Sequence, residues 1–248
     1  MQRFYSAEEY DPFMEVEGSK SLSQSLYELA KPFGLRWKSR IIKKYHPAPG
    51  KILDIGAGTG VFLDYMRSLG WSVKGIEKDP TAARYAREKL NLEVHIGDLA
   101  DMDNPEAEFD IITFWHSLEH IHRFKENIEI AVDLLTETGH LFIALPNPVS
   151  LDAKIYREKW VAWDIPRHLW HFQPQAVGKL LSDFGLNVRA KSAMPLDPFY
   201  NCLLSEFLVK GGTWWRFPLR LPIVSLCSFL SGLISGEKGS SITYIAAK

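Results

Sequence analysis

The chain has 248 residues, of which 46% are hydrophobic and 24% are charged. The length suggests one large α/β domain or two small domains, and the composition excludes a collagenous or disordered chain. The 29 basic and 30 acidic residues nearly cancel, so overall charge gives no reason to expect nucleic acid as a partner. The only two cysteines, Cys202 and Cys227, exclude a disulfide framework and a zinc ribbon and fit a reducing compartment.

Neither the start of the chain nor its apolar stretches predict membrane insertion. The N-terminal segment is polar and acidic, which excludes a secretory signal. The longest uncharged apolar stretch, Leu221–Gly236, is shorter than the ~20 residues that a membrane span needs. We therefore expect a cytoplasmic protein, with peripheral contact at a membrane surface as an alternative.

Short β-rich runs alternate with helical patterns from Lys51 to about Pro195, which predicts a parallel sheet with crossover helices. The expected strands are 51–55, 72–77, 92–97, 109–115, 140–146, 186–194 and 241–248, and the expected helices are 61–70, one beginning at Asp79-Pro80, one through 124–135 and 173–184. Residues 19–46 predict one or two helices with Trp37, Ile41 and Tyr45 on one face. These elements suggest three segments: an N-terminal helical cap (1–48), a core (49–195 and 240–248) and an apolar helical insertion (196–239).

The glycine-rich run LDIGAGTG, residues 53–60, joins the first strand directly to a helix. Glycines let the backbone turn tightly and let a ligand approach it closely. The spacing is not G-x-G-x-x-G, because the third glycine comes one residue early, and this weakens a dinucleotide-binding interpretation. Asp54, Glu77 and Asp98 lie at the ends of three successive expected strands and therefore at the same edge of the sheet. Any one of these acids alone would be explained more simply as a solvent-exposed loop residue, but the three together favour a ligand site.

This order of motifs resembles the class I S-adenosylmethionine-dependent methyltransferases over residues 45–195. With HSLEHI and the later PRHLWHF, the chain is similar to the small-molecule branch near the ubiquinone and menaquinone methyltransferases. The resemblance implies a Rossmann-like, doubly wound α/β fold whose seven-stranded sheet has an antiparallel last strand. It also implies S-adenosyl-L-methionine as cofactor, with S-adenosyl-L-homocysteine as product, and in-line methyl transfer to an oxygen, nitrogen or carbon of a small hydrophobic or aromatic acceptor. The predicted cofactor residues are Asp54, Gly56, Ala57, Gly58, Gly60, Glu77, Lys78, Asp98, Leu99 and His116.

The run HSLEH, residues 116–120, spells the inverted zinc-protease motif H-x-x-E-H. It begins directly after a strand and not inside a long helix, and no third ligand stands out among His95, His122, His168 and His171, so we predict no metal site. We expect His116 to line the pocket. His116 and His168 are the candidate bases for a hydroxyl acceptor.

Two segments do not follow the alternation of strands and helices. Residues 147–172 are rich in aromatic side chains and follow the fifth strand at the rim where ligands bind in open α/β folds. The predicted acceptor-binding residues from this segment are Asn147, Tyr156, Trp160, Trp163, Arg167 and His171, although Trp160 could equally be packing. The insertion 196–239 is more apolar than a surface loop, and we expect a lid, a homodimer surface or a membrane-facing element anchored by Trp214, Trp215, Arg216 and Arg220.

Two other functions fit parts of the pattern. A non-catalytic module that binds the cofactor or docks on a membrane would share the glycine-rich turn and the apolar insertion. An NAD-dependent oxidoreductase would share the sheet, but its glycine spacing differs. The sequence therefore favours a methyltransferase whose partner is a small-molecule acceptor.

Overall fold

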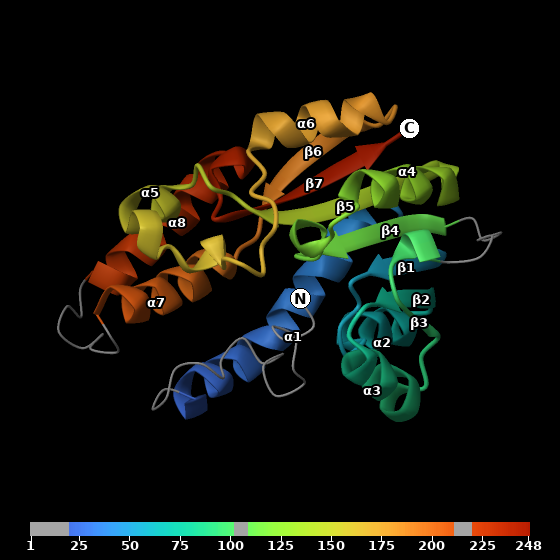
Figure 1. Cartoon of the computed structure of the whole chain (residues 1–248), viewed down its shortest axis with the longest axis horizontal. Coiled ribbons are helices and arrows are strands. Elements are labelled where there is room, and N and C mark those ends of the chain that lie inside the picture. Colours follow the sequence, from blue (N-terminus) through green and yellow to red (C-terminus); the bar gives the residue numbers. More distant parts are fainter. Residues whose placement is uncertain (1–19, 102–108, 211–219) are drawn as a thin grey trace. The chain divides into compact units, whose positions relative to one another are not determined.

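A computed structural model of the chain describes residues 20–101, 109–210 and 220–248 (Figure 1). Its strands form one seven-stranded sheet in the order β3-β2-β1-β4-β5-β7-β6. The strands are β1 (Lys51–Ile55), β2 (Ser72–Glu77), β3 (Val94–Ile96), β4 (Phe109–Trp115), β5 (Leu135–Pro146), β6 (Asn187–Ala193) and β7 (Ser241–Ala247). The pairs β1–β2, β1–β4 and β2–β3 are parallel, whereas β7 runs antiparallel to both of its neighbours. The predicted fold class is confirmed.

The chain divides into two compact units, and we describe each by itself. Unit 1 comprises the described parts of Met1–Thr113 together with Asp133–His140, and unit 2 comprises those of Phe114–Val132 and Leu141–Lys248. This division does not follow the three segments expected from the sequence, which stay a prediction.

In unit 1 the expected elements appear close to their predicted bounds. The helices are α1 (Lys20–Tyr45), α2 (Val61–Ser68) and α3 (Pro80–Leu90). The side chain of Asp79 accepts hydrogen bonds from the backbone N–H groups of Thr81 and Ala82, which caps α3 as the sequence predicts. The expected helices before the sheet are one continuous α1, in which Ile42 is fully buried and Ile41 is only partly so. Helices α2 and α3 pack on β2 and β3.

Unit 2 holds α4 (Phe124–Leu134), α5 (Leu151–Tyr156), α6 (Pro174–Asp183), α7 (Asp197–Lys210) and α8 (Arg220–Ile234). The segment expected to be an irregular aromatic connection contains α5 and two short 3₁₀ turns, Arg157–Lys159 and Val161–Trp163. The insertion is helical as predicted, and α7 and α8 pack against each other and against α5 (Figure 1). A buried cluster that includes Tyr156, Trp160 and Cys202 lies among these three helices.

Helix α8 packs largely through small residues together with Val224, and several of its large apolar residues are exposed. Ser225, Ser228 and Gly232 are buried, and a Cβ on Gly232 would lie only 2.9 Å from the Cβ of Ala193 in β6. The large apolar side chains of the opposite face are between 46% and 82% exposed: Ile223, Leu226, Leu230, Leu233 and Ile234. An apolar face of this kind is typical of an interaction surface. Among the described residues, no helix has both the length and the apolar character needed to cross a bilayer. Trp214, Trp215 and Arg216 lie outside the described residues.

Candidate cofactor and acceptor sites

The glycine-rich turn of unit 1 adopts the left-handed backbone that its glycines permit. Gly56, Gly58 and Gly60 have φ angles of 81°, 55° and 77°, a region that disfavours other residues. The backbone N–H groups of Gly56 and Ala57 both donate to the carbonyl of Ile76 at the end of β2, at 2.8 and 2.9 Å. The turn is therefore bonded to β2 before it enters α2.

The carboxylate of Glu77 joins this turn to the start of the next helix. Its Oε2 accepts from the Gly58 N–H at 2.6 Å, and its Oε1 accepts from the Asp79 N–H at 2.7 Å. The residue is 5% exposed, and burial raises the pKa of the carboxyl although these backbone donors act to lower it. Each carboxylate oxygen can accept more than one hydrogen bond, so Glu77 is fixed in place with acceptor capacity remaining for the hydroxyls of a sugar.

Asp54, in β1, is a buried carboxylate. Within the part of the chain that the structure describes, no buried cationic side chain is bonded to it. It is 2% exposed, and its Oδ1 accepts a hydrogen bond from the Oγ1 of Thr113 at 2.6 Å. Burial raises its pKa to about 7; the Thr113 hydrogen bond and the charge of Lys38 lower the pKa by less than burial raises it. A carboxylate in this state gains from a bound cation, because the cation offsets part of the lost solvation.

The third acidic residue lies beyond β3. Asp98 accepts from the Nζ of Lys78 at 3.3 Å, so these two predicted cofactor residues are paired. Leu99 is buried in a 3₁₀ turn, Leu99–Asp101, and the N–H of Gly97 donates to the backbone carbonyl of Glu77 at 3.0 Å. Unit 1 thus connects Glu77 with both the glycine turn and the segment that carries Asp98.

In unit 2, His116 lies between two carboxylates. Its Nε2 is 3.0 Å from Oδ2 of Asp197, and its Nδ1 is 3.4 Å from Oε1 of Glu119. Burial acts to lower the pKa of His116, but the contacts with the two acids outweigh it and raise the pKa to about 10. The ring therefore carries a proton at neutral pH, and the structure argues against the predicted role of His116 as a base in that state.

The two histidine-bearing motifs of the sequence meet in unit 2. The backbone carbonyl of Glu119 accepts from the N–H groups of Leu169 and Trp170, which fixes the PRHLWHF segment onto the HSLEH turn. The rings of His120 and His168 stack edge to face with centroids 4.7 Å apart, and Nε2 of His168 is 4.0 Å from Oε1 of Glu119. Of the four histidines that the sequence left open as a third ligand, His168 is therefore the one that lies beside Glu119 and His120, whereas His116 is not part of this group.

Three predicted acceptor residues have structural roles. Asn147 is 1% exposed, and its amide donates to the carbonyls of Glu237 and Gly239. The indole N–H of the buried Trp160 donates to Asp152, which also accepts from Ser228 and Ser240. Tyr156, also buried, donates its hydroxyl to Oε1 of Glu206 at 2.8 Å, and burial is the largest cause of a raised pKa. These polar groups are used inside the protein, so the prediction that they contact the acceptor is not supported.

The remaining acceptor candidates stand on one connected segment. Arg167 makes a bidentate ion pair with Asp164, the ring of His171 stacks on Trp163, and the indole N–H of Trp163 donates to the carbonyl of Arg157. Trp163 and Arg167 are partly exposed and His171 is exposed. They stay predictions as acceptor-binding residues.

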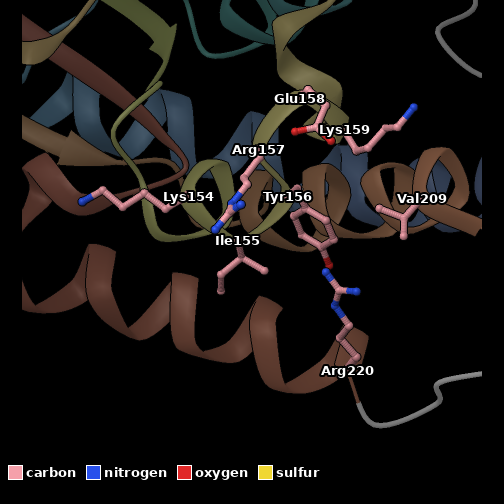
Figure 2. Close-up of a pocket in the computed structure, with 8 residues that line it drawn as sticks. All are labelled: Lys154, Ile155, Tyr156, Arg157, Glu158, Lys159, Val209 and Arg220. Carbon is pink, nitrogen blue, oxygen red and sulfur yellow. The ribbon is translucent and has the colours of Figure 1, made fainter.

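An open hollow of about 670 Å³ lies where α5 and the following turn approach α7 and α8 (Figure 2). Its basic lining residues are Lys154, Arg157, Lys159 and Arg220, and the Arg220 guanidinium lies 5.2 Å from the centre of the Tyr156 ring. Of the predicted site residues only Tyr156 lines it. We therefore do not assign the acceptor to this hollow.

Three residues that matter in these sites were not singled out by sequence reasoning. Thr113 and Asp197 contact Asp54 and His116 over separations of 59 and 81 residues, which no local pattern reveals. Asp152 organises the packing of Trp160 in the same way. Glu119 and His120 were visible in the sequence as part of the H-x-x-E-H spacing. That spacing did not show which other residue lies beside them, and the structure shows that it is His168.

Comparisons with known proteins agree with this geometry. Residues 26–191 match the family model of a methyltransferase domain. A ubiquinone biosynthesis O-methyltransferase from Xanthomonas axonopodis pv. citri is 25% identical over 170 residues, which cover 64% of this chain and 71% of the relative.

Among solved structures, magnesium protoporphyrin IX methyltransferase from Synechocystis superposes with a TM-score of 0.64 at 13% identity, covering 99% of this chain and 97% of that chain. Phosphoethanolamine N-methyltransferase 2 from Haemonchus contortus superposes with a TM-score of 0.57 at 15% identity, covering 86% and 52%. At these identities the structures show a shared fold, and the family model extends over more than half of the chain. The chain belongs to the methyltransferase domain family, as its resemblance to the class I S-adenosylmethionine-dependent methyltransferases predicted.

Proposed function

We propose that the protein methylates an oxygen of a small, hydrophobic acceptor and that it binds S-adenosylmethionine through the glycine-rich turn, Asp54 and Glu77. The observation that carries the cofactor assignment is the fixed carboxylate of Glu77, which is bonded to the Gly58 N–H within a turn of three left-handed glycines. A dinucleotide site would need a different glycine spacing.

The residues of unit 1 suit the chemical groups of S-adenosylmethionine. The two oxygens of Glu77 can accept from the ribose hydroxyls, as the acid at the end of the second strand does in related nucleotide folds. The buried carboxylate of Asp54 suits the positively charged methionine end, because its own charge is otherwise poorly solvated. Leu99 offers an apolar surface and Asp98 an acceptor for the adenine.

The cofactor and the acceptor contribute different parts of the reaction. When bound, S-adenosylmethionine would supply the methyl group of a sulfonium. The acceptor oxygen would form the new C–O bond as the C–S bond breaks and S-adenosylhomocysteine leaves, and the hydroxyl proton would pass to a base or to solvent water. The protein holds the two reactants in contact, and such positioning is worth about 7–11 kcal/mol of the barrier. The side chains of unit 1 would bind the donor and exclude water from its charged centre.

The choice of a hydrophobic acceptor and of oxygen as the methylated atom has two supports. The relative from Xanthomonas is a ubiquinone biosynthesis O-methyltransferase, which favours oxygen as the methylated atom here. Independently, the outward face of α8 presents Leu226, Leu230 and Leu233 to solvent. A surface of this kind favours an apolar ligand or the lipid that carries it.

A two-stage experiment tests this function. Calorimetry with S-adenosylmethionine and, separately, with NAD identifies the cofactor. Transfer of labelled methyl is then measured on pairs of phenols and catechols that differ only in an alkyl or prenyl tail. We expect S-adenosylmethionine to bind and NAD not to bind. We also expect faster labelling of the tailed member of each pair. Binding of NAD, or labelling only of amines, would contradict the proposal. Cofactor binding without any methyl transfer to a broad panel would favour a non-catalytic module.

A further inference from the structure

The side chains of Glu119, His120 and His168 form a cluster in unit 2, of which only His168 was considered for a part in methyl transfer, as a candidate base. Each offers one oxygen or nitrogen, and these atoms all lie within 4.8 Å of one another. Two histidines and a glutamate are a ligand set found in zinc enzymes. The cluster joins the HSLEH turn to the PRHLWHF segment, which are separated by almost fifty residues along the chain.

The carboxylate of Glu119 is the first observation that indicates a ligand. The residue is 0% exposed, and among the described residues no donor makes a hydrogen bond to either of its carboxylate oxygens. Its ion-pair contacts are with Nδ1 of His116 at 3.4 Å and Nε2 of His168 at 4.0 Å. At these distances both contacts are long, and a bound cation would add a direct partner for the buried carboxylate.

The two histidines are the second observation, because their tautomers are set by backbone carbonyls. Nδ1 of His168 lies 2.8 Å from the carbonyl of Ala162, and Nδ1 of His120 lies 3.0 Å from the carbonyl of Arg167. A carbonyl oxygen only accepts, so each Nδ1 must carry the proton, and in the neutral ring the lone pair is then on Nε2. Metal-binding histidines are held in this way by a hydrogen bond from the second nitrogen.

From this geometry we propose that Glu119, His120 and His168 bind one divalent transition-metal ion, with zinc as the best match. Ligands at about 2.0–2.1 Å from zinc in a tetrahedron lie about 3.3 Å apart. In the structure these atoms lie within 4.8 Å of one another, so they would have to move closer together around the ion. Three protein ligands leave a fourth position for water or for an oxygen of a bound molecule. The ion would also hold the PRHLWHF segment onto the end of β4.

The test uses the full-length protein after treatment with a chelator and removal of that chelator. Titration with ZnCl₂ and with CoCl₂ in a calorimeter should show one ion per chain. Glu119→Gln and His168→Gln should each weaken binding at least a hundredfold. The matched control is His122→Gln, which changes an exposed histidine of the same turn outside the cluster and should leave binding unchanged. Metal binding by both ligand variants with the affinity of the unaltered chain would overturn the proposal.

A second measurement needs no variant and so does not depend on how the variants fold. Nitrogen NMR of the imidazole rings in the unaltered protein should show zinc-dependent shifts at Nε2 of His120 and His168 but none at His122. One equivalent of cobalt should also give the visible absorption of a four-coordinate site. Absence of both signals would overturn the proposal. Calorimetry with S-adenosylmethionine on the same sample is scored separately, so failure of the metal site and failure of the proposed function are distinguishable.

Discussion

Replacing Asp54 with asparagine should stabilise the unliganded protein, and more so at alkaline pH. The folded state raises the pKa of Asp54 to about 7 from 3.8, so this carboxyl favours the folded state when protonated. That advantage is complete at a pH below 4 and is lost as the pH rises to about 7. Asparagine keeps an oxygen to accept the hydrogen bond from Thr113 but never ionises.

The expected size follows from the two pKa values. The ionisation penalty for Asp54 is roughly 4 kcal/mol at pH 8.5 and about 2 kcal/mol at pH 5. Chemical denaturation of both proteins at the two pH values measures it, because the titration of all other groups cancels in the difference. A gain from Asp54→Asn that does not increase from pH 5 to pH 8.5 would refute this account of Asp54.

The same substitution should have the opposite effect on cofactor binding. The positive charge of S-adenosylmethionine favours the ionised carboxylate, so the affinity of the unaltered protein should fall below pH 7, by up to about tenfold per pH unit. The Asp54→Asn protein should bind more weakly at pH 8 and show a flatter pH profile. Calorimetry at pH 5.5, 7 and 8.5 measures both. Equal affinities at pH 8 would show that Asp54 does not contact the charged end of the cofactor.

Three further variants test other parts of the account. Glu77→Ala should weaken S-adenosylmethionine binding tenfold or more, because each lost charge-assisted hydrogen bond is worth about 1.5–3 kcal/mol. Glu88→Ala, which changes an exposed glutamate, is the control. Undiminished affinity in the folded Glu77→Ala variant would exclude Glu77 as the ribose-binding residue. Gly58→Val should abolish cofactor binding, since valine disfavours a φ of 55°, and calorimetry that detects normal binding would contradict this. Leu226→Glu combined with Leu230→Glu should leave cofactor affinity unchanged and slow methylation only of tailed acceptors. Gel filtration and vesicle sedimentation of the same variant decide whether a second subunit or a lipid surface binds this face. If the variant methylates tailed and untailed acceptors with the same relative rates as the unaltered protein, α8 does not take part in selecting the acceptor.

The parts of the fold that local sequence determines were predictable. The turn from β1 to α2 needs glycines at positive φ, the Asp79-Pro80 pair caps α3, and both requirements are visible within a few residues. The order of the motifs then led to the family and the seven-stranded sheet. The helical insertion was predictable from its apolar content, but the inward direction of Ser228 and Gly232 was not, because it depends on contacts with Asp152 and Ala193.

The candidate sites were predictable only where their partners are close in the sequence. Asn147 is polar and follows a strand, which favours a ligand contact, yet its hydrogen bonds go to carbonyls about ninety residues away. For Trp160 the sequence left acceptor binding and packing open, and the hydrogen bond from its indole N–H to the buried Asp152 favours packing. Glu119 and His120 are visible in the sequence as part of an H-x-x-E-H run, but only the structure brings His168 beside them. Chemistry that depends on long-range pairing cannot be inferred from spacing.

The central claim is that the glycine-rich turn and Glu77 form a binding site for S-adenosylmethionine. Calorimetric titration of the full-length protein with S-adenosylhomocysteine tests it most directly, since this product binds the same site without turnover. We expect saturable binding with one molecule per chain, abolished by Gly58→Val and retained by Glu88→Ala. No binding by the unaltered protein, or unchanged binding by Gly58→Val, would contradict the account.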